Sequence, residues 1–205
     1  MPLLWKFLRE GMKSEYGDCV WKVGEWKKED RAEKCSKGFH ASENILDALR
    51  YVQGEVLARV EVRGECDKDD TKQAWTEMRI KKAYKWTKAE SIKLAIFAAY
   101  SVLDIYEKQY PNDKRPRLAI EAAEKYVADP NDANQNAAED AAEDAAEAAE
   151  AAETAAYAAY GAAYAAASAA AYAAASAAAR AAYGATPKKI EKYLRSRINE
   201  LEEIK

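Results

Sequence analysis

The residues best suited to acid–base or ligand chemistry lie in one stretch of the 205-residue chain, CSKGFHASENILDALRYVQGEVLARVEVRGE, residues 35–65. It contains His40, the only histidine, whose titration range suits a general base or a contact to a nucleotide. Tyr51 follows, and its ring could stack on a planar ligand. Glu77, in AWTEMRI, is the one carboxylate loosely placed to complete a catalytic set. The alternatives are structural: a histidine bonded to backbone at a strand end, and a tyrosine packed with its helix.

The cysteines and the charge pattern exclude several classes of protein. Cys19, Cys35 and Cys66 are odd in number and lack Cys-x-x-Cys spacing, which disfavours a disulfide framework and a zinc site. We therefore expect free thiols, no metal and no cofactor. The N-terminus is charged too early for a secretory signal, and acidic residues interrupt the alanine-rich tract too often for a bilayer span. The chain is expected to be cytoplasmic, without membrane contact and without direct nucleic-acid binding.

A second group of candidate residues lies in the alanine-rich segment, where bulky side chains recur three or four residues apart. Its carboxylates have three interpretations: they keep an alanine helix soluble, they imitate a phosphate backbone, or they bind a divalent ion. Its tyrosines form either a packing seam or, if exposed, a surface for a partner. The predicted binding surface consists of Glu139, Asp140, Glu143, Asp144, Glu147, Tyr157, Tyr160 and Tyr164.

Mixed α/β patterning fills residues 1–86. Apolar residues at helical spacing predict a helix that is capped by Ser42 or Asn44 and stopped by Gly54. The polar run over residues 66–73 is expected to be a loop. Alternating apolar and polar residues, with aromatic and β-branched types, predict a strand pair or a strand with a turn at Gly24 over 18–26, and a strand over 57–62. A strand end is expected over 38–42 and a strand or strand pair over 75–84.

From Thr87 onward the pattern is helical. Thr87 and Glu90 form a capping box that starts a helix reaching Tyr110. Further helices are predicted over 115–127 and 188–204, and short connections predict antiparallel neighbours. In the first helix Ile92, Ile96, Ala99, Leu103 and Tyr106 are expected to face the core; in the second, Leu118, Ala122 and Tyr126; in the last, Ile190, Leu194, Ile198 and Leu201.

The resulting fold class is α+β, with a small mixed α/β module over residues 1–86 and an alanine-rich antiparallel helical bundle over residues 87–205. Residues 1–88 carry 19 basic and 16 acidic side chains, whereas residues 89–205 carry 13 and 19. The two parts therefore differ in charge, and the helical part is acidic. Whether the alanine-rich segment is one long helix or a hairpin bent near Gly161 stays open.

Two resemblances accompany these patterns. The motifs KFLREG, YGDCVWKVGEW, CSKGFHAS and VEVRGE resemble uncharacterised bacterial and phage proteins, and the helical half, with DKRPR (113–117) and AIEAA (119–123), is similar to immunity proteins. The stretch GFHASENILDALRYVQGEVLARVEVRG resembles the central motif of poly(ADP-ribose) polymerases. That resemblance implies an NAD pocket in which His40 replaces a strand tyrosine, Tyr51 stacks on nicotinamide and Glu77 is the late carboxylate.

The function expected first is a non-enzymatic, protein-binding inhibitor of phage or mobile-element type, either anti-defence, such as an anti-CRISPR, or immunity-type. It would act by steric occlusion of a protein partner, for which a nucleic-acid-binding defence complex is one candidate. One alternative is an ADP-ribosyltransferase-like or NAD-binding enzyme that uses His40 and Tyr51. Another is an acidic helix that mimics nucleic acid. Smooth alanine faces also allow two copies of the chain to pair as a homo-oligomer.

Overall fold

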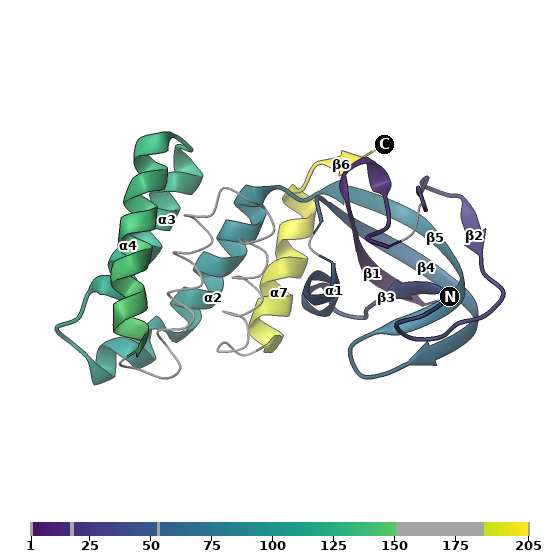
Figure 1. Cartoon of the computed structure of the whole chain (residues 1–205), viewed down its shortest axis with the longest axis horizontal. Helices are drawn as coiled ribbons and strands as arrows, with labels where there is room; N and C mark the ends of the chain where they lie inside the picture. The colour runs from purple at the N-terminus through teal and green to yellow at the C-terminus, as the bar shows by residue number, and fades with distance from the viewer. Residues whose placement is uncertain (1, 17–18, 53, 151–186, 205) are drawn as a thin grey trace. The chain divides into compact units, whose positions relative to one another are not determined.

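The computed structural model describes residues 2–16, 19–52, 54–150 and 187–204. It confirms the predicted α+β class, with a curled sheet in the N-terminal part and helices after it (Figure 1). Contacts divide the chain into two compact units, one of residues 1–86 and 194–205 and the other of residues 87–193. Each unit is described by itself below.

The first unit contains an antiparallel sheet in the order β1-β4-β5-β2, with β3 and β6 also paired to β5. Two long strands, β4 and β5, dominate it as a hairpin, and half of the predicted polar loop belongs to them: residues 66–68 to β4 and residue 73 to β5. The predicted loop over residues 66–73 is wrong at both ends, since β4 continues past Gly64, which has a φ of +88°. The strands are β1 (Leu3–Leu8), β2 (Trp26–Lys28), β3 (Phe39–Ala41), β4 (Val56–Lys68), β5 (Gln73–Lys85) and β6 (Glu203–Ile204).

One face of this sheet forms the core of the first unit. Trp21 and Phe39 pack edge to face there, with ring centroids 5.1 Å apart. Burying apolar area of this kind is the main favourable term in folding, at about 25 cal/mol per Å². Successive side chains of a strand point to opposite faces of the sheet, so every second one faces the core. The core residues of β4 and β5 include Ala58, Val60, Val62, Met78 and Ile80.

Helix α1 (Ile45–Tyr51) begins after Asn44, as predicted, and buries Ile45, Ala48 and Leu49. The predicted strand pair over residues 18–26 is wrong for most of its length, since only Trp26 belongs to a named strand. Residues before it make isolated bridges, and Gly24 turns the chain with a φ of +87°. A short 3-10 helix, η1 (Glu10–Met12), precedes them.

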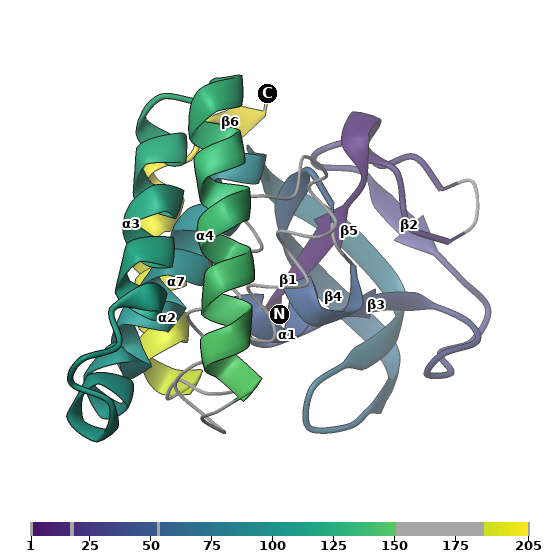
Figure 2. The ribbon, with the colours of Figure 1, turned by 60° about the vertical axis from the view of Figure 1, so that its left-hand side comes forward.

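The second unit is helical. Contacts join α2 to α3 and α3 to α4, and in both views α3 and α4 lie side by side (Figure 2). The hydroxyl oxygen of Thr87 accepts from the backbone N–H of Glu90, which confirms the predicted helix start. The helices are α2 (Lys88–Gln109), α3 (Arg115–Ala128), α4 (Asp132–Glu150) and α7 (Pro187–Arg197), the division between the two units falling within α7.

Two details of the helical prediction are wrong. Leu118 is 54% exposed, and α3 instead buries Ala119, Ile120 and Ala123, because its core face is turned by about one residue from the predicted one. The last helix ends at Arg197 rather than at residue 204. A 3-10 turn, η2 (Ile198–Glu200), follows, and β6 then satisfies its backbone groups on β5 instead of within a helix. The inward face predicted for α2 is confirmed, as are the inward positions of Ile190 and Leu194 in α7.

Candidate functional site

His40 lies at the centre of the short strand β3, opposite Ala74 of β5. Its Nε2 accepts a hydrogen bond from the backbone N–H of Cys35 at 3.2 Å, and its carbonyl oxygen accepts from Lys6 Nζ at 3.0 Å. Burial lowers the pKa of His40 to about 4, and the nearby charges of Lys6 and Lys72 act in the same direction. The imidazole is therefore neutral at pH 7 with Nε2 already bonded, which confirms the structural interpretation of a histidine held by backbone.

Tyr51 ends α1 and is 39% exposed, so it is not the packed helix residue that its spacing indicates. Its hydroxyl oxygen lies 2.6 Å from the Thr71 hydroxyl, and Lys72 Nζ lies 4.5 Å from the centre of its ring. A cation over an aromatic face is attracted by the ring quadrupole. One face of the Tyr51 ring is thus occupied by a lysine.

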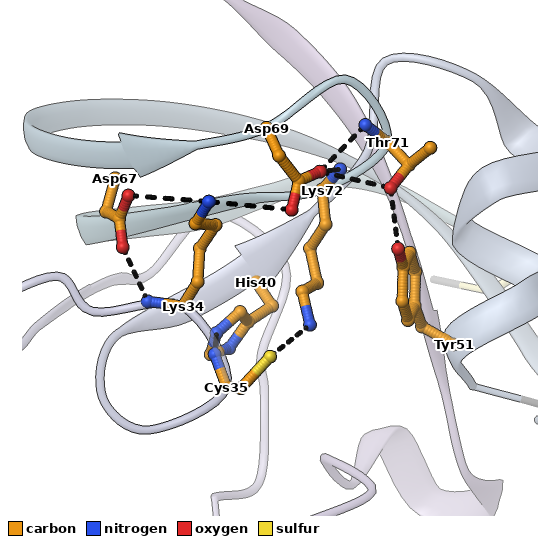
Figure 3. A network of polar contacts seen from close by, with 8 residues as sticks. All are labelled: Lys34, Cys35, His40, Tyr51, Asp67, Asp69, Thr71 and Lys72. Atoms are coloured by element: carbon orange, nitrogen blue, oxygen red, sulfur yellow. Dashed lines mark hydrogen bonds and ion pairs between the residues drawn. The ribbon is translucent and has the colours of Figure 1, made fainter.

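Around these two residues a network of polar contacts joins the β4–β5 turn to the loop before β3 (Figure 3). Asp69 accepts from the backbone N–H groups of Thr71 and Lys72, which lowers the pKa of its carboxyl to about 2. Lys72 Nζ donates to Cys35 Sγ at 3.1 Å, and Lys34 Nζ lies between Asp69 and Asp67. This turn lies inside the loop predicted over residues 66–73, and Asp69, two residues before Thr71, is a recognised turn signal within it.

The space beside His40 is small. A cavity of about 40 Å³ is lined by residues that include His40, Tyr51, Lys6 and Lys72, whereas pockets for drug-sized ligands and cofactors occupy about 300–1,000 Å³. Glu77 does not line it. Its carboxylate instead accepts from Arg63 Nε at 2.7 Å and lies 3.9 Å from Lys28 Nζ. His40 and Tyr51 thus share this cavity while Glu77 lies elsewhere, and the expectation of an ADP-ribosyltransferase site finds no support.

The predicted acidic surface falls on α4. Small alanines pack α4 against α3, since Ala145 and Ala141 meet Ala119. Asp140 and Asp144 are exposed. Glu139 is half-buried and accepts from Gln135 Nε2. The side chains of Glu143 and Glu147 lie outside the described part of the structure, as do residues Tyr157, Tyr160 and Tyr164 entirely.

The connection between α2 and α3 is held by ion pairs. Asp113 accepts from the guanidinium of Arg115 and from the Tyr106 hydroxyl, at 2.6 Å and 2.8 Å. These bonds hold the pKa of Asp113 well below its usual range, and burial together with the Asp113 carboxylate raises the pKa of Tyr106 to about 12. Arg117 donates twice to Glu107, at 2.7 Å each. These ion pairs tie α2 to α3 at their connection.

Within the described ranges, His, Cys, Asp and Glu side chains form no group of three able to hold a metal ion. The described helices also include none with both the length and the apolar character needed to cross a bilayer. The cysteines Cys19, Cys35 and Cys66 are free thiols, as predicted.

A match that includes all of the helical unit and strand β5 decides the family. Residues 68–202 match the family described as Immunity protein Imm5, which covers more than half of the chain. The chain belongs to the Imm5 family of immunity proteins. The predicted likeness to immunity proteins is thereby confirmed, whereas the predicted likeness to poly(ADP-ribose) polymerases finds no support.

The N-terminal unit of the Imm5 protein matches a second family. Residues 3–92, which include most of the sheet, match a domain described as Domain of unknown function (DUF7666). Comparisons with curated proteins and with solved structures found no match.

Proposed function

We propose that this protein binds a protein toxin and inhibits it by covering a basic surface of that toxin with the exposed acidic face of α4. The observation that carries the proposal is the Imm5 match, which includes the whole of α2, α3 and α4. An immunity protein works by recognising its toxin, so the surface of the helical unit is where recognition is expected.

The charge of α4 supports this choice of surface. The helix contains seven acidic residues and no basic one. Asp140 and Asp144, four residues apart, are exposed and lie about 6 Å apart along the axis at 1.5 Å rise per residue. The alanine face of α4 is meanwhile used for packing on α3. A row of carboxylates steers a basic partner and speeds association in a salt-dependent way.

Occlusion is also favoured over chemistry. His40 is neutral and bonded to backbone, its cavity holds about 40 Å³, and Glu77 is paired elsewhere. The carboxylates of α4 would fit a toxin that binds nucleic acid. The nucleic-acid-binding surface of such a toxin carries clustered lysines and arginines, which attract carboxylates. Inhibition would then be stoichiometric, with one chain blocking one toxin.

The test begins by capturing the partner from the source cells with the tagged chain and purifying it. A double variant, Asp140→Lys with Asp144→Lys, reverses charge on the exposed face of α4. The matched control reverses two other exposed acids of the same unit, Asp104→Lys with Glu121→Lys. Circular dichroism checks that each variant is folded.

The proposal expects the α4 variant to inhibit the toxin at least about tenfold less tightly, a loss of about 1.4 kcal/mol, while the control changes little. Inhibition by the unaltered chain should also weaken as salt is raised. Equal inhibition by both variants would exclude the acidic face of α4 as the binding surface.

A further inference from the structure

A second, larger cavity lies in the sheet unit. It measures about 510 Å³, opens to solvent, and shares no residue with the small space beside His40. Its size falls within the range of pockets that bind cofactors and metabolites. The lining residues that matter for its chemistry are Arg59, Lys68, Arg195, Gln73, Trp75 and Glu43.

A β-bulge builds one wall of this cavity. The β4–β5 register shifts by one residue between Arg63 and Cys66. Before the shift, Val62 faces the core opposite Met78; after it, Lys68 stands opposite Gln73. A one-residue slip sends the following side chains to the other face of the sheet. The bulge therefore places Lys68 beside Gln73 and Trp75 instead of in the core.

The cavity is electropositive. Three cationic side chains, Arg59, Lys68 and Arg195, face one carboxylate, Glu43, whose Oε1 already accepts from Gln73 Nε2 at 2.7 Å. The guanidinium carbon of Arg59 lies 4.3 Å from the ring centre of Trp5, so this cation is held by stacking. Planar, forked guanidinium groups suit phosphate oxygens, which they bind two at a time.

The same cavity has an aromatic wall. Trp75 is half-buried, and its Nε1 donates to Gln73 Oε1 at 3.0 Å. Because Gln73 is itself bonded to Glu43, the indole is held by a chain of two hydrogen bonds. Exposed Leu3 and buried Leu4 extend the apolar lining. An oriented indole offers a surface on which a planar base can stack.

We infer that this cavity binds a nucleotide, with the phosphates against Arg59, Lys68 and Arg195 and the base against Trp75. The site differs from the rejected NAD site, because it uses none of His40, Tyr51 and Glu77. It also goes beyond toxin inhibition, since it gives the sheet unit a small-molecule ligand of its own.

The experiment is isothermal titration calorimetry of the full chain with adenosine diphosphate as the probe. Binding by the unaltered chain is expected, with at least about tenfold weaker binding after Lys68→Gln or Arg195→Gln, a loss of about 1.4 kcal/mol. The matched control is Lys22→Gln, an exposed lysine of the same unit that does not line the cavity. It should bind as the unaltered chain does.

Two further probes separate the parts of the ligand. Adenosine lacks the phosphates and pyrophosphate lacks the base, so each should bind more weakly than adenosine diphosphate. Trp75→Leu should weaken the binding of adenosine diphosphate but not the binding of pyrophosphate. No heat at millimolar adenosine diphosphate, or equal weakening by Lys22→Gln, overturns the inference. Pyrophosphate binding as tightly as the diphosphate also overturns it, because the base would then contribute nothing.

Discussion

At the scale of single residues, His40 illustrates what a sequence can and cannot reveal. Its position at a strand end indicated a backbone-bonded histidine, and the bond from Cys35 confirms this. Its competing role as a catalytic base depended on Glu77, whose carboxylate the fold pairs with Arg63 across the β4–β5 ladder. No local pattern reveals such a cross-strand pairing, because it depends on the register of two strands.

The histidine gives a direct spectroscopic prediction. As it is the only one in the chain, its imidazole signals can be followed by NMR without assignment. The midpoint of the titration should lie near pH 4 rather than 6.5, because burial and two lysines disfavour the imidazolium. A midpoint near 6.5 would show that the imidazole is solvated instead.

The same pKa has a consequence for stability. Between pH 4 and 6.5 the unfolded chain binds a proton at His40 that the folded chain does not. Stability from this group is therefore present above pH 6.5 and is lost as the pH falls toward 4. Urea unfolding of the unaltered chain and of His40→Gln measures this, and the loss of stability between pH 6.5 and 4 should be smaller in the variant. Identical pH profiles of the two proteins would contradict a lowered pKa of His40 in the folded chain.

At the scale of elements, a long helix with regular apolar spacing was predictable, whereas the inward face of an alanine-rich helix was not. Helix α2 follows its capping box and its apolar spacing, so its start and inner face were predicted. In α3, alanines stand on several faces and leave the phase undefined by sequence, which is why Leu118 was placed inward although it is 54% exposed. The hairpin strands β4 and β5 were underestimated because a glycine and a bulge interrupt their alternation.

The link between α2 and α3 should be sensitive to loss of one carboxylate. Asp113→Ala removes the acceptor of Arg115 and of the Tyr106 hydroxyl, and hydrogen bonds to charged groups contribute about 1.5–3 kcal/mol. We expect a loss of about 2 kcal/mol in the free energy of unfolding, measured in urea. Asp104→Ala, at an exposed position of α2, is the control and should change stability by less than about 0.5 kcal/mol.

The entry to β4 should tolerate no side chain at Gly54. A Cβ there would lie 2.1 Å from the carbonyl oxygen of Leu8, which is backbone and cannot turn away. Gly54→Ala is expected to cost about 3 kcal/mol, at the upper end of overpacking. Gly24→Ala meets open space and should cost only about 1–2 kcal/mol for its positive φ. Thermal unfolding of the two variants compares them, and equal losses would contradict the close contact.

At the scale of the whole molecule, composition and periodicity sufficed for the α+β class, while the likeness to immunity proteins came from the resemblance of particular motifs in residues 113–123. They did not reveal that residues 194–205 group with the sheet unit, where β6 pairs with β5. A strand of two residues has no period of its own, so only the long-range pairing defines it. The electropositive cavity was missed for the same reason, since its cations come from β4 and from the end of α7.

The central claim is that this Imm5-family protein inhibits a protein partner by forming a complex with it. The most direct measurement titrates the activity of the purified toxin with increasing amounts of the chain. Occlusion predicts that activity falls in proportion to added chain and vanishes at one chain per toxin, with a complex of that composition in light scattering. Activity lost at a small fraction of one equivalent, without a stable complex, would show that the chain modifies its partner catalytically and would contradict the account.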